Sequence, residues 1–270
     1  IVINQWLENA DVPDASINGY LKTIRNFMRY RADMGNQVYL PPFRKEKDLY
    51  IPYIFSDNEL SEIFSIADAY PMVNPKSSIP YIHMEIAFLL RLLYCCGLRL
   101  GEALELQVCH LDLENGVIRI INSKNKKQRL VPVHDTIKKM LIDYCRALEI
   151  YGTDDSFLFP GKDKHLSQIT AERHFKTILK KAGIITGQEE RHKRGPCLHC
   201  LRHRFMFSAF KKFEAAGYSV DMASPYLSVY CGHESLLESE KYMKFSSELF
   251  EKEVLRFSDF SEQLFPEVPI

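Results

Sequence analysis

Residues 94–106, YCCGLRLGEALEL, interrupt a long apolar helical pattern that runs over 82–106. Gly97 breaks the pattern, because glycine disfavours the interior of a helix. Arg99 follows where the helix restarts, and Glu102 comes three residues later. The stretch therefore predicts two helical segments, with an arginine and a carboxylate at the junction between them.

Regular patterns extend on both sides of this junction. Ser16 can cap a helix over 16–35, and Ser56 with Glu59 makes a capping box for a helix that begins there. The strand-like segments 116–121 and 129–133 flank a polar turn, SKNKKQ, and predict a β-hairpin. Further helices are expected over 134–150, 168–182, 199–216 and 246–260. The predicted fold class is mainly α with a small antiparallel β-sheet.

Prolines indicate a break between two parts of the chain. Pro41, Pro42 and Pro52 interrupt the helical pattern, which is typical of a linker. We therefore expect a helical domain within 1–45, a linker over 46–55 and a larger domain over 56–245. The remaining segment, 246–270, is expected to be a C-terminal helix and tail.

The composition is that of a globular protein with an ample core. Of 270 residues, 46% are hydrophobic and 26% are charged, and no apolar run reaches membrane-spanning length. The seven cysteines show no disulfide-framework spacing. We therefore expect a cytoplasmic protein with no membrane association.

Charge is distributed unevenly, although the formal net charge is zero. Basic residues gather over 124–129 and 188–212, and acidic residues prevail after His233. The basic segments could form a face for nucleic acid, or they could be solvated surfaces. The candidate DNA contacts are Arg25, Arg29, Lys126, Lys127, Arg129, Lys193, Arg194 and Arg204.

The segment CLHCLRHRF, residues 197–205, admits two interpretations. Its cysteines and histidines suggest zinc, but Cys197 and Cys200 have no second ligand pair nearby in sequence. His199 and Arg202 are three residues apart, so they share one face of a helix and could bind a phosphate. We favour the phosphate interpretation, with the cysteines as packing residues and no metal.

Cleavage of a phosphodiester needs donors that stabilise negative charge on the non-bridging oxygens. Guanidinium groups suit this task, because each presents paired donors in a rigid plane. A lysine or histidine can protonate the leaving oxygen, and a side-chain nucleophile can conserve the bond energy covalently. The chain offers Arg99 and Arg202 for the first of these tasks.

These motifs together resemble the tyrosine recombinases of the phage integrase family. GLRLGE resembles the first arginine motif, which implies that Arg99 binds the scissile phosphate with Glu102 in support. SKNKKQRLVP resembles the hairpin lysine motif, which implies Lys124 as the general acid. The resemblance covers about 56–245.

The second half of the chain supplies the remaining motifs of this resemblance. HCLRH implies His199 and Arg202 as catalytic residues, with His203 in support. GH gives His233, and Tyr242 stands at the family's spacing from it, which implies the nucleophile. Tyr242 would form a 3′-phosphotyrosyl link and release a 5′-hydroxyl, with no metal, ATP or other cofactor.

The resemblance also implies partners and architecture. We expect a two-domain clamp on double-stranded DNA at specific sites, a homo-oligomer such as a tetramer, and no small-molecule substrate. The first domain is short, so 1–45 would be the C-terminal part of a helical core-binding domain. The segment between Arg202 and His233 is longer than in compact Xer-type members, which favours the integrase of a transposon-like mobile element.

Two other functions stay open, and so does the role of the last helix. The chain could be a DNA-relaxing enzyme similar to type IB topoisomerases, or a catalytically inactive DNA-binding accessory protein of the same fold. The helix over 246–260 could fold back on its own domain or dock onto a neighbouring protomer.

Overall fold

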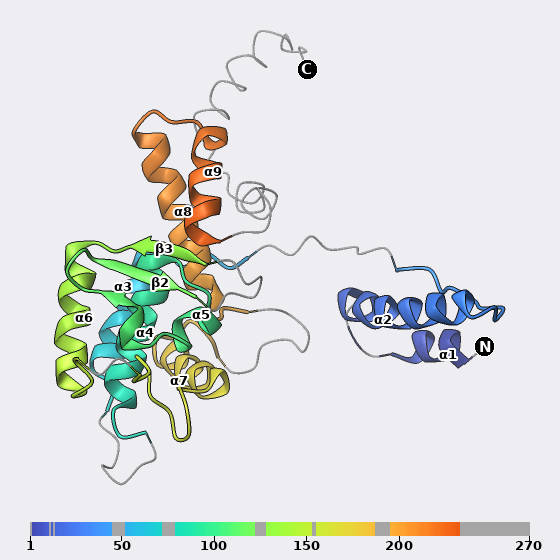
Figure 1. Cartoon of the computed structure of the whole chain (residues 1–270), viewed down its shortest axis with the longest axis horizontal. Coiled ribbons are helices and arrows are strands. Elements are labelled where there is room, and N and C mark those ends of the chain that lie inside the picture. The colour runs from blue at the N-terminus through green and yellow to red at the C-terminus, as the bar shows by residue number, and fades with distance from the viewer. Residues whose placement is uncertain are drawn as a thin grey trace, which may run out of the picture. The chain divides into compact units, whose positions relative to one another are not determined.

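Figure 1 shows the computed structural model, which describes residues 2–10, 12, 14–44, 52–71, 79–121, 128–152, 155–186 and 195–232. These residues fall into two compact units, the first formed by the chain up to Ile51 and the second beginning at Pro52. The described chain is mainly helical with one small antiparallel sheet, which confirms the predicted fold class.

The described part of the first unit contains two helices, α1 (Val2–Asn9) and α2 (Asp14–Asp33). Ile17 and Leu21 on α2 are fully buried. An extended segment then returns along α2, because the side-chain amide of Asn18 exchanges two hydrogen bonds of 2.9 Å with the backbone of Arg44. The helix predicted over 16–35 is thus confirmed, whereas α1 was not predicted.

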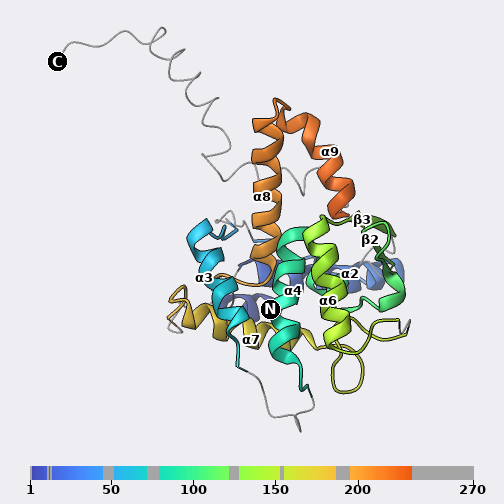
Figure 2. The same ribbon diagram turned by 90° about the vertical axis from the view of Figure 1, so that its left-hand side faces the viewer.

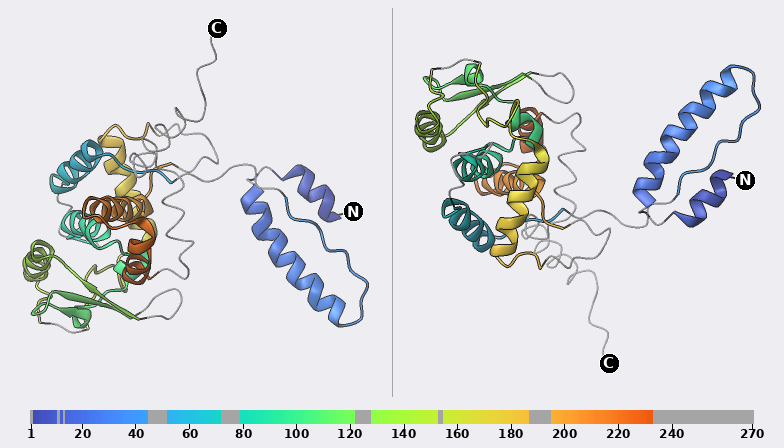
Figure 3. Two further views of the ribbon diagram at one scale, coloured as in Figure 1. Left: turned by 90° about the horizontal axis from the view of Figure 1, so that it is seen from above. Right: turned by 90° about the horizontal axis from the view of Figure 1, so that it is seen from below.

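The second unit is built around α4 (Ile82–Cys96), which lies between α3 (Asp57–Asp68) and α6 (Asp135–Ala147) (Figures 2 and 3). Helices α7 (Gln168–Lys181) and α8 (His199–Ala215) also contact α4. Ile86, Leu89 and Leu90 of α4 are completely buried, as a central helix requires. The predicted capping box is present, with Ser56 and Glu59 bonding each other's backbone at the start of α3.

The end of α4 follows the predicted break. Gly97 has φ 58° and ψ 27°, the left-handed conformation that commonly ends a helix, and the short helix α5 (Leu100–Leu104) restarts directly after Arg99. The chain then passes through the 3₁₀ turn η1 (Val108–His110) into the sheet. Arg99 is therefore held at a fixed junction between two helices.

The sheet has three antiparallel strands in the order β1 (Leu111–Asp112), β2 (Val117–Ile120) and β3 (Arg129–Pro132). The predicted hairpin is β2 with β3, and its register pairs Ile118 with Val131. Strand β1 was not predicted, because two residues are too few to show a period of two.

Helices α8 and α9 (Val220–Cys231) form an antiparallel pair that extends away from the rest of the unit (Figures 1 and 2). A second hydrophobic cluster holds them together, formed by Met206, Phe207, Phe210, Ala223, Leu227 and Cys231. The C-terminal end of α9 returns to the sheet, where the Tyr230 hydroxyl donates a hydrogen bond of 3.2 Å to the Pro132 carbonyl. This return positions the candidate site.

Candidate active site

Arg99 is fixed by the backbone and by a carboxylate. As the residue that precedes α5, it donates its backbone N–H to Glu102 Oε2 at 3.0 Å, while its Nη1 donates to Glu102 Oε1 at 3.1 Å. Its Nη2 donates to the Gly232 carbonyl at 2.8 Å. The guanidinium keeps 22% side-chain exposure, so it is oriented by the protein and still open to solvent.

Arg202 lies deeper, on α8. It is only 1% exposed, and its two terminal nitrogens donate to the backbone carbonyls of Gly97 and Cys231. Gly97 ends α4 and Cys231 is the last residue of α9. One buried guanidinium thereby joins the C-terminal ends of two helices that are far apart in sequence.

Arg129 completes the group from the start of β3. Its Nη1 and Nη2 form a bidentate pair with Glu102 at 2.9 and 2.7 Å, and its Nε donates to the Tyr230 carbonyl at 2.9 Å. The side chain is 8% exposed. The sequence predicts Arg129 as a DNA contact, and in the structure its three nitrogens donate to Glu102 and Tyr230, so it also supports the Glu102 carboxylate.

Three arginines thus bind three consecutive carbonyls at the end of α9. Arg129 donates a hydrogen bond to the Tyr230 carbonyl, Arg202 donates to that of Cys231, and Arg99 donates to that of Gly232. The last carbonyls of a helix lack intrahelical donors and carry its partial negative charge, so cations are favourable there. The arrangement draws segments from α5, β3 and α8 to the point where the chain leaves α9.

Glu102 counters this concentration of positive charge. Burial alone would raise the pKa of its carboxyl, but hydrogen bonds and charge from Arg129, followed by those from Arg99, hold the pKa below its usual value. The carboxylate is therefore ionised at neutral pH. Its side chain is 3% exposed, so this charge depends on both arginines.

His199 lies one turn before Arg202 on α8, and the residue is exposed to solvent. Desolvation by the surrounding protein, followed by the charges of Arg202 and Arg99, lowers the pKa of His199 to about 4. The His203 ring lies edge-on to it, with ring centroids 4.6 Å apart. At neutral pH His199 is a neutral imidazole, in which one ring nitrogen donates a hydrogen bond and the other accepts one.

The other predicted site residues are distributed as follows. Lys124, Lys126, Lys127, Lys193, Arg194, His233 and Tyr242 lie outside the described residues. Arg25 donates to the Pro41 carbonyl at 2.6 Å and lies over the Phe43 ring, and Arg29 is exposed on α2. Arg204 forms an ion pair with Asp57 of α3. The structure therefore brings together Arg99, Glu102, His199, Arg202 and His203.

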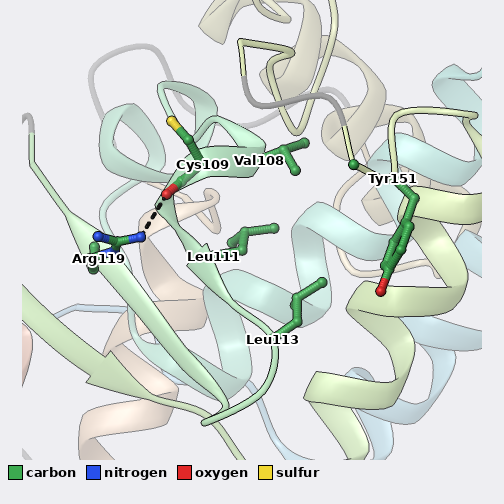
Figure 4. A pocket seen from close by; sticks show the side chains of 7 residues that line it. Val108, Cys109, Leu111, Leu113, Arg119 and Tyr151 are labelled. Carbon is green, nitrogen blue, oxygen red and sulfur yellow. Dashed lines mark hydrogen bonds between the residues drawn. The ribbon is translucent and has the colours of Figure 1, made fainter.

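A surface pocket of about 460 Å³ lies elsewhere in the second unit (Figure 4). Its apolar wall includes Leu111 and Leu113, and Arg119 donates a hydrogen bond of 2.9 Å to the Cys109 carbonyl at its edge. None of the predicted site residues that the structure describes lines it. The pocket therefore supplies nothing to the arginine group.

Two kinds of feature are absent from the described ranges. Within them, no three His, Cys, Asp or Glu side chains are grouped so that they could hold a metal ion. No helix in the same part of the chain has both the length and the apolar character needed to cross a bilayer.

Comparison with known proteins agrees with the geometry. Residues 55–245 match the phage integrase family. The chain belongs to this family. The matched residues include the junction that carries Arg99, the hairpin and the whole of α8 and α9. The predicted family is thereby confirmed.

Curated members of the family resemble the chain over much of its length. A putative integrase/recombinase, y4rE, of Sinorhizobium fredii is 30% identical over 92% of this chain and 72% of its own length. Tyrosine recombinase XerC of Thermodesulfovibrio yellowstonii is 28% identical over 68% of this chain and 59% of its own length. This integrase-family chain is thus similar to both groups of recombinases.

Solved structures show the same fold. The Tn1549 transposon integrase in complex with transposon right end DNA gives a TM-score of 0.67 at 16% identity, covering 95% of this chain and 83% of that one. The XerH site-specific recombinase bound to palindromic difH substrate gives 0.67 at 22% identity, covering 92% and 67%. The fold of this family member is therefore that of the tyrosine recombinases.

Proposed function

We propose that the protein is a site-specific DNA recombinase that cuts and rejoins DNA through a 3′-phosphotyrosyl intermediate on Tyr242. The observation that carries the proposal is the convergence of Arg99 and Arg202, from distant parts of the sequence, on consecutive carbonyls at the end of α9. His233 directly follows Gly232, the residue whose carbonyl Arg99 binds, and Tyr242 comes nine positions after His233. Family membership supports the same chemistry.

In this proposal the two arginines hold the scissile phosphate. A rigid guanidinium offers several N–H donors, so a group anchored by one or two protein carbonyls can still present others to a phosphate oxygen. Fixed donors of this kind are each worth about a hundredfold to a thousandfold in rate. His199 is neutral at neutral pH because its pKa is low, and the one N–H of the neutral ring donates a hydrogen bond to the same phosphate.

The remaining steps fall to residues predicted from sequence. Tyr242 attacks phosphorus, its proton leaves with the help of His233, and Lys124 protonates the departing 5′-oxygen. A 5′-hydroxyl from a partner strand then reverses the step. Because the phosphotyrosyl bond conserves the energy of the cleaved bond, the proposal requires neither ATP nor metal. We also propose that the protein acts as a tetramer on DNA and that it is cytoplasmic.

A nicked duplex that traps the cleaved state tests this chemistry. The wild-type protein is expected to form a covalent protein–DNA adduct that survives denaturation, and Tyr242→Phe is expected to form none. Tyr226→Phe is the matched control, because Tyr226 is 72% exposed on α9 and lies outside the proposed machinery. Adduct formation by Tyr242→Phe at the wild-type level would refute the proposed nucleophile.

The adduct assay and a plasmid assay together separate the alternative functions. An inactive accessory protein would bind the duplex without any adduct. An enzyme similar to type IB topoisomerases would relax plasmids of any sequence, whereas a recombinase needs two copies of one site. We propose a mobile element as the source, which the resemblance to y4rE and the transposon integrase fold supports. Element ends in the DNA flanking the gene would test that origin.

A further inference from the structure

Cys197 and Cys200 form a close pair at the start of α8. Their sulfur atoms are 3.6 Å apart, and the Cys200 N–H donates to the Cys197 carbonyl at 2.9 Å, which closes one turn of backbone. Cys200 is completely buried, whereas Cys197 is exposed. The sequence-based interpretation of both as packing residues is therefore wrong for Cys197.

The two thiols differ in chemical character. A hydrogen bond from the Cys200 thiol, followed by the backbone N–H groups of His199 and Cys200, lowers the pKa of Cys197. Burial and the neighbouring sulfur raise the pKa of Cys200. The thiolate is the nucleophilic form of cysteine, and an exposed thiolate beside a second thiol is the usual arrangement of a redox-sensitive site.

We propose that Cys197 and Cys200 form a reversible disulfide by exchange with a small-molecule disulfide of the glutathione class, and that this bond inhibits the adjacent arginine–histidine site. A disulfide needs a sulfur separation near 2.05 Å, so the sulfurs have to approach by only about 1.5 Å. Residues three apart in one helical turn meet the Cα separation that a disulfide requires.

The thiol–disulfide exchange proceeds in two steps. The Cys197 thiolate attacks one sulfur of the small disulfide, forms a mixed disulfide and releases one small thiolate. Cys200 then loses its proton to solvent and attacks the Cys197 sulfur, which forms the internal bond and releases a second small thiolate. Each thiolate takes a proton from solvent, so two protein thiols are oxidised while one small disulfide is reduced to two thiols.

Closing this bond would disturb His199, because His199 lies between the two cysteines in sequence. The turn that the disulfide tightens is the turn that presents the imidazole beside Arg202 and Arg99. Displacement of a catalytic group by about 1 Å can lower the rate roughly a hundredfold. This consequence for cleavage rests on the proposed function, whereas disulfide formation does not.

The bond itself is tested without DNA. The full chain is equilibrated with defined ratios of oxidised and reduced glutathione, the remaining thiols are alkylated, and peptides are identified by mass. We expect one internal disulfide joining Cys197 to Cys200, with dithiothreitol restoring both thiols. Cys95 is the matched control, because it is also exposed and has a cysteine neighbour, Cys96, that is buried. Cys197 and Cys95 oxidised to the same extent, or no 197–200 bond, would overturn the proposal.

The inhibition is tested on the nicked duplex with oxidised and reduced protein. Oxidation is expected to lower adduct formation by about tenfold or more, reversibly, while Cys197→Ser stays active in both buffers. Cys95→Ser is expected to behave as the wild type. Equal cleavage by oxidised and reduced wild-type protein would overturn the inhibition. Absence of cleavage by fully reduced wild-type protein would instead count against the proposed function, and the disulfide measurement would stand.

Discussion

The Glu102 carboxylate accepts hydrogen bonds from both terminal nitrogens of Arg129, with Nη1–Oε1 and Nη2–Oε2 distances of 2.9 and 2.7 Å. The side chains are 3% and 8% exposed, so the pair lies almost entirely in the protein interior. It joins α5 to β3 beneath the end of α9. Removing one partner of such a pair leaves a buried charge uncompensated, which is more costly than the net value of the pair.

Arg129→Ala is expected to destabilise the protein by about 3–5 kcal/mol, because Arg99 is then the one remaining cationic partner of Glu102 among the described residues. Urea denaturation followed by circular dichroism measures the change. The control is Arg119→Ala, since Arg119 is an exposed strand residue with one hydrogen bond to a carbonyl, and its loss should stay within about 1 kcal/mol. Equal losses in the two variants would contradict the structural role of the buried pair.

Arg202→Ala and Arg99→Ala are expected to differ in stability. Arg202 is 1% exposed and satisfies two buried carbonyls, so its removal is expected to lose about 2–5 kcal/mol. Arg99 keeps 22% side-chain exposure, and Glu102 keeps its bidentate pair with Arg129 when Arg99 is removed, so Arg99→Ala should lose less stability, retain much DNA binding and lose cleavage. Thermal melting and gel-shift assays test both expectations. Similar melting temperatures for the two variants would contradict the first.

Gly97→Ala is expected to destabilise the protein through a steric clash as well as backbone strain. A Cβ at Gly97 would lie 2.4 Å from the Phe205 ring, and its φ is +58°. Gly183 has φ +68° and, among the described residues, no atom within 4 Å of the same added carbon, so Gly183→Ala isolates the backbone cost of about 1–2 kcal/mol. Gly97→Ala should lower the free energy of unfolding clearly more than Gly183→Ala does, as measured by denaturation. A loss no larger than that of Gly183→Ala would refute the clash.

Because of Glu85, the folded protein is expected to become less stable as the pH rises. This carboxyl on α4 is 1% exposed, neither oxygen has a hydrogen-bond partner among the described residues, and desolvation by burial raises its pKa to about 8. The unfolded chain ionises near the ordinary value of 4.5, so between about 4.5 and 8 the folded state binds more protons. Stability is therefore lost progressively over that window.

Replacing Glu85 removes this pH dependence. Because ionisation favours the unfolded state of the wild type by about 3 kcal/mol at pH 7, Glu85→Gln should gain stability relative to the wild type between pH 5 and pH 8. Melting curves at both pH values provide the measurement. Glu62→Gln serves as the control because Glu62 is exposed on α3, and it should follow the wild-type curve. Parallel curves for Glu85→Gln and the wild type would show that Glu85 does not titrate in this way.

His199 is expected to gain a proton more readily when DNA binds. Its pKa is lowered to about 4 by desolvation and by Arg202 and Arg99, and a bound phosphodiester would offset the two cations. NMR titration of labelled histidine, with and without a short duplex, should show the His199 pKa rising on binding. Arg99→Met should raise the pKa in the free protein and reduce the change. An unaltered value with bound DNA would place the phosphate elsewhere.

Local signals predicted much of the architecture correctly. The Ser56–Glu59 capping box, the helix break at Gly97 and the hairpin of β2 with β3 each depend on residues close in sequence. Helix α9 escaped prediction because Pro225 lies within it and its apolar residues are too dispersed for a clear period. Its stability comes from packing against α8, which a window of sequence does not reveal.

The sequence by itself determined most of the helical segments and the hairpin, because propensity and periodicity are properties of neighbouring residues, and it indicated the motif residues Arg99, Glu102, His199 and Arg202 through their resemblance to a known family. Only the tertiary structure decided that Arg129 pairs with Glu102 inside the protein and that Cys197 is exposed beside a buried partner. It also decided that three arginines meet successive carbonyls of α9. Those relationships join distant segments, and the desolvation that fixes their charges exists only once the core has formed.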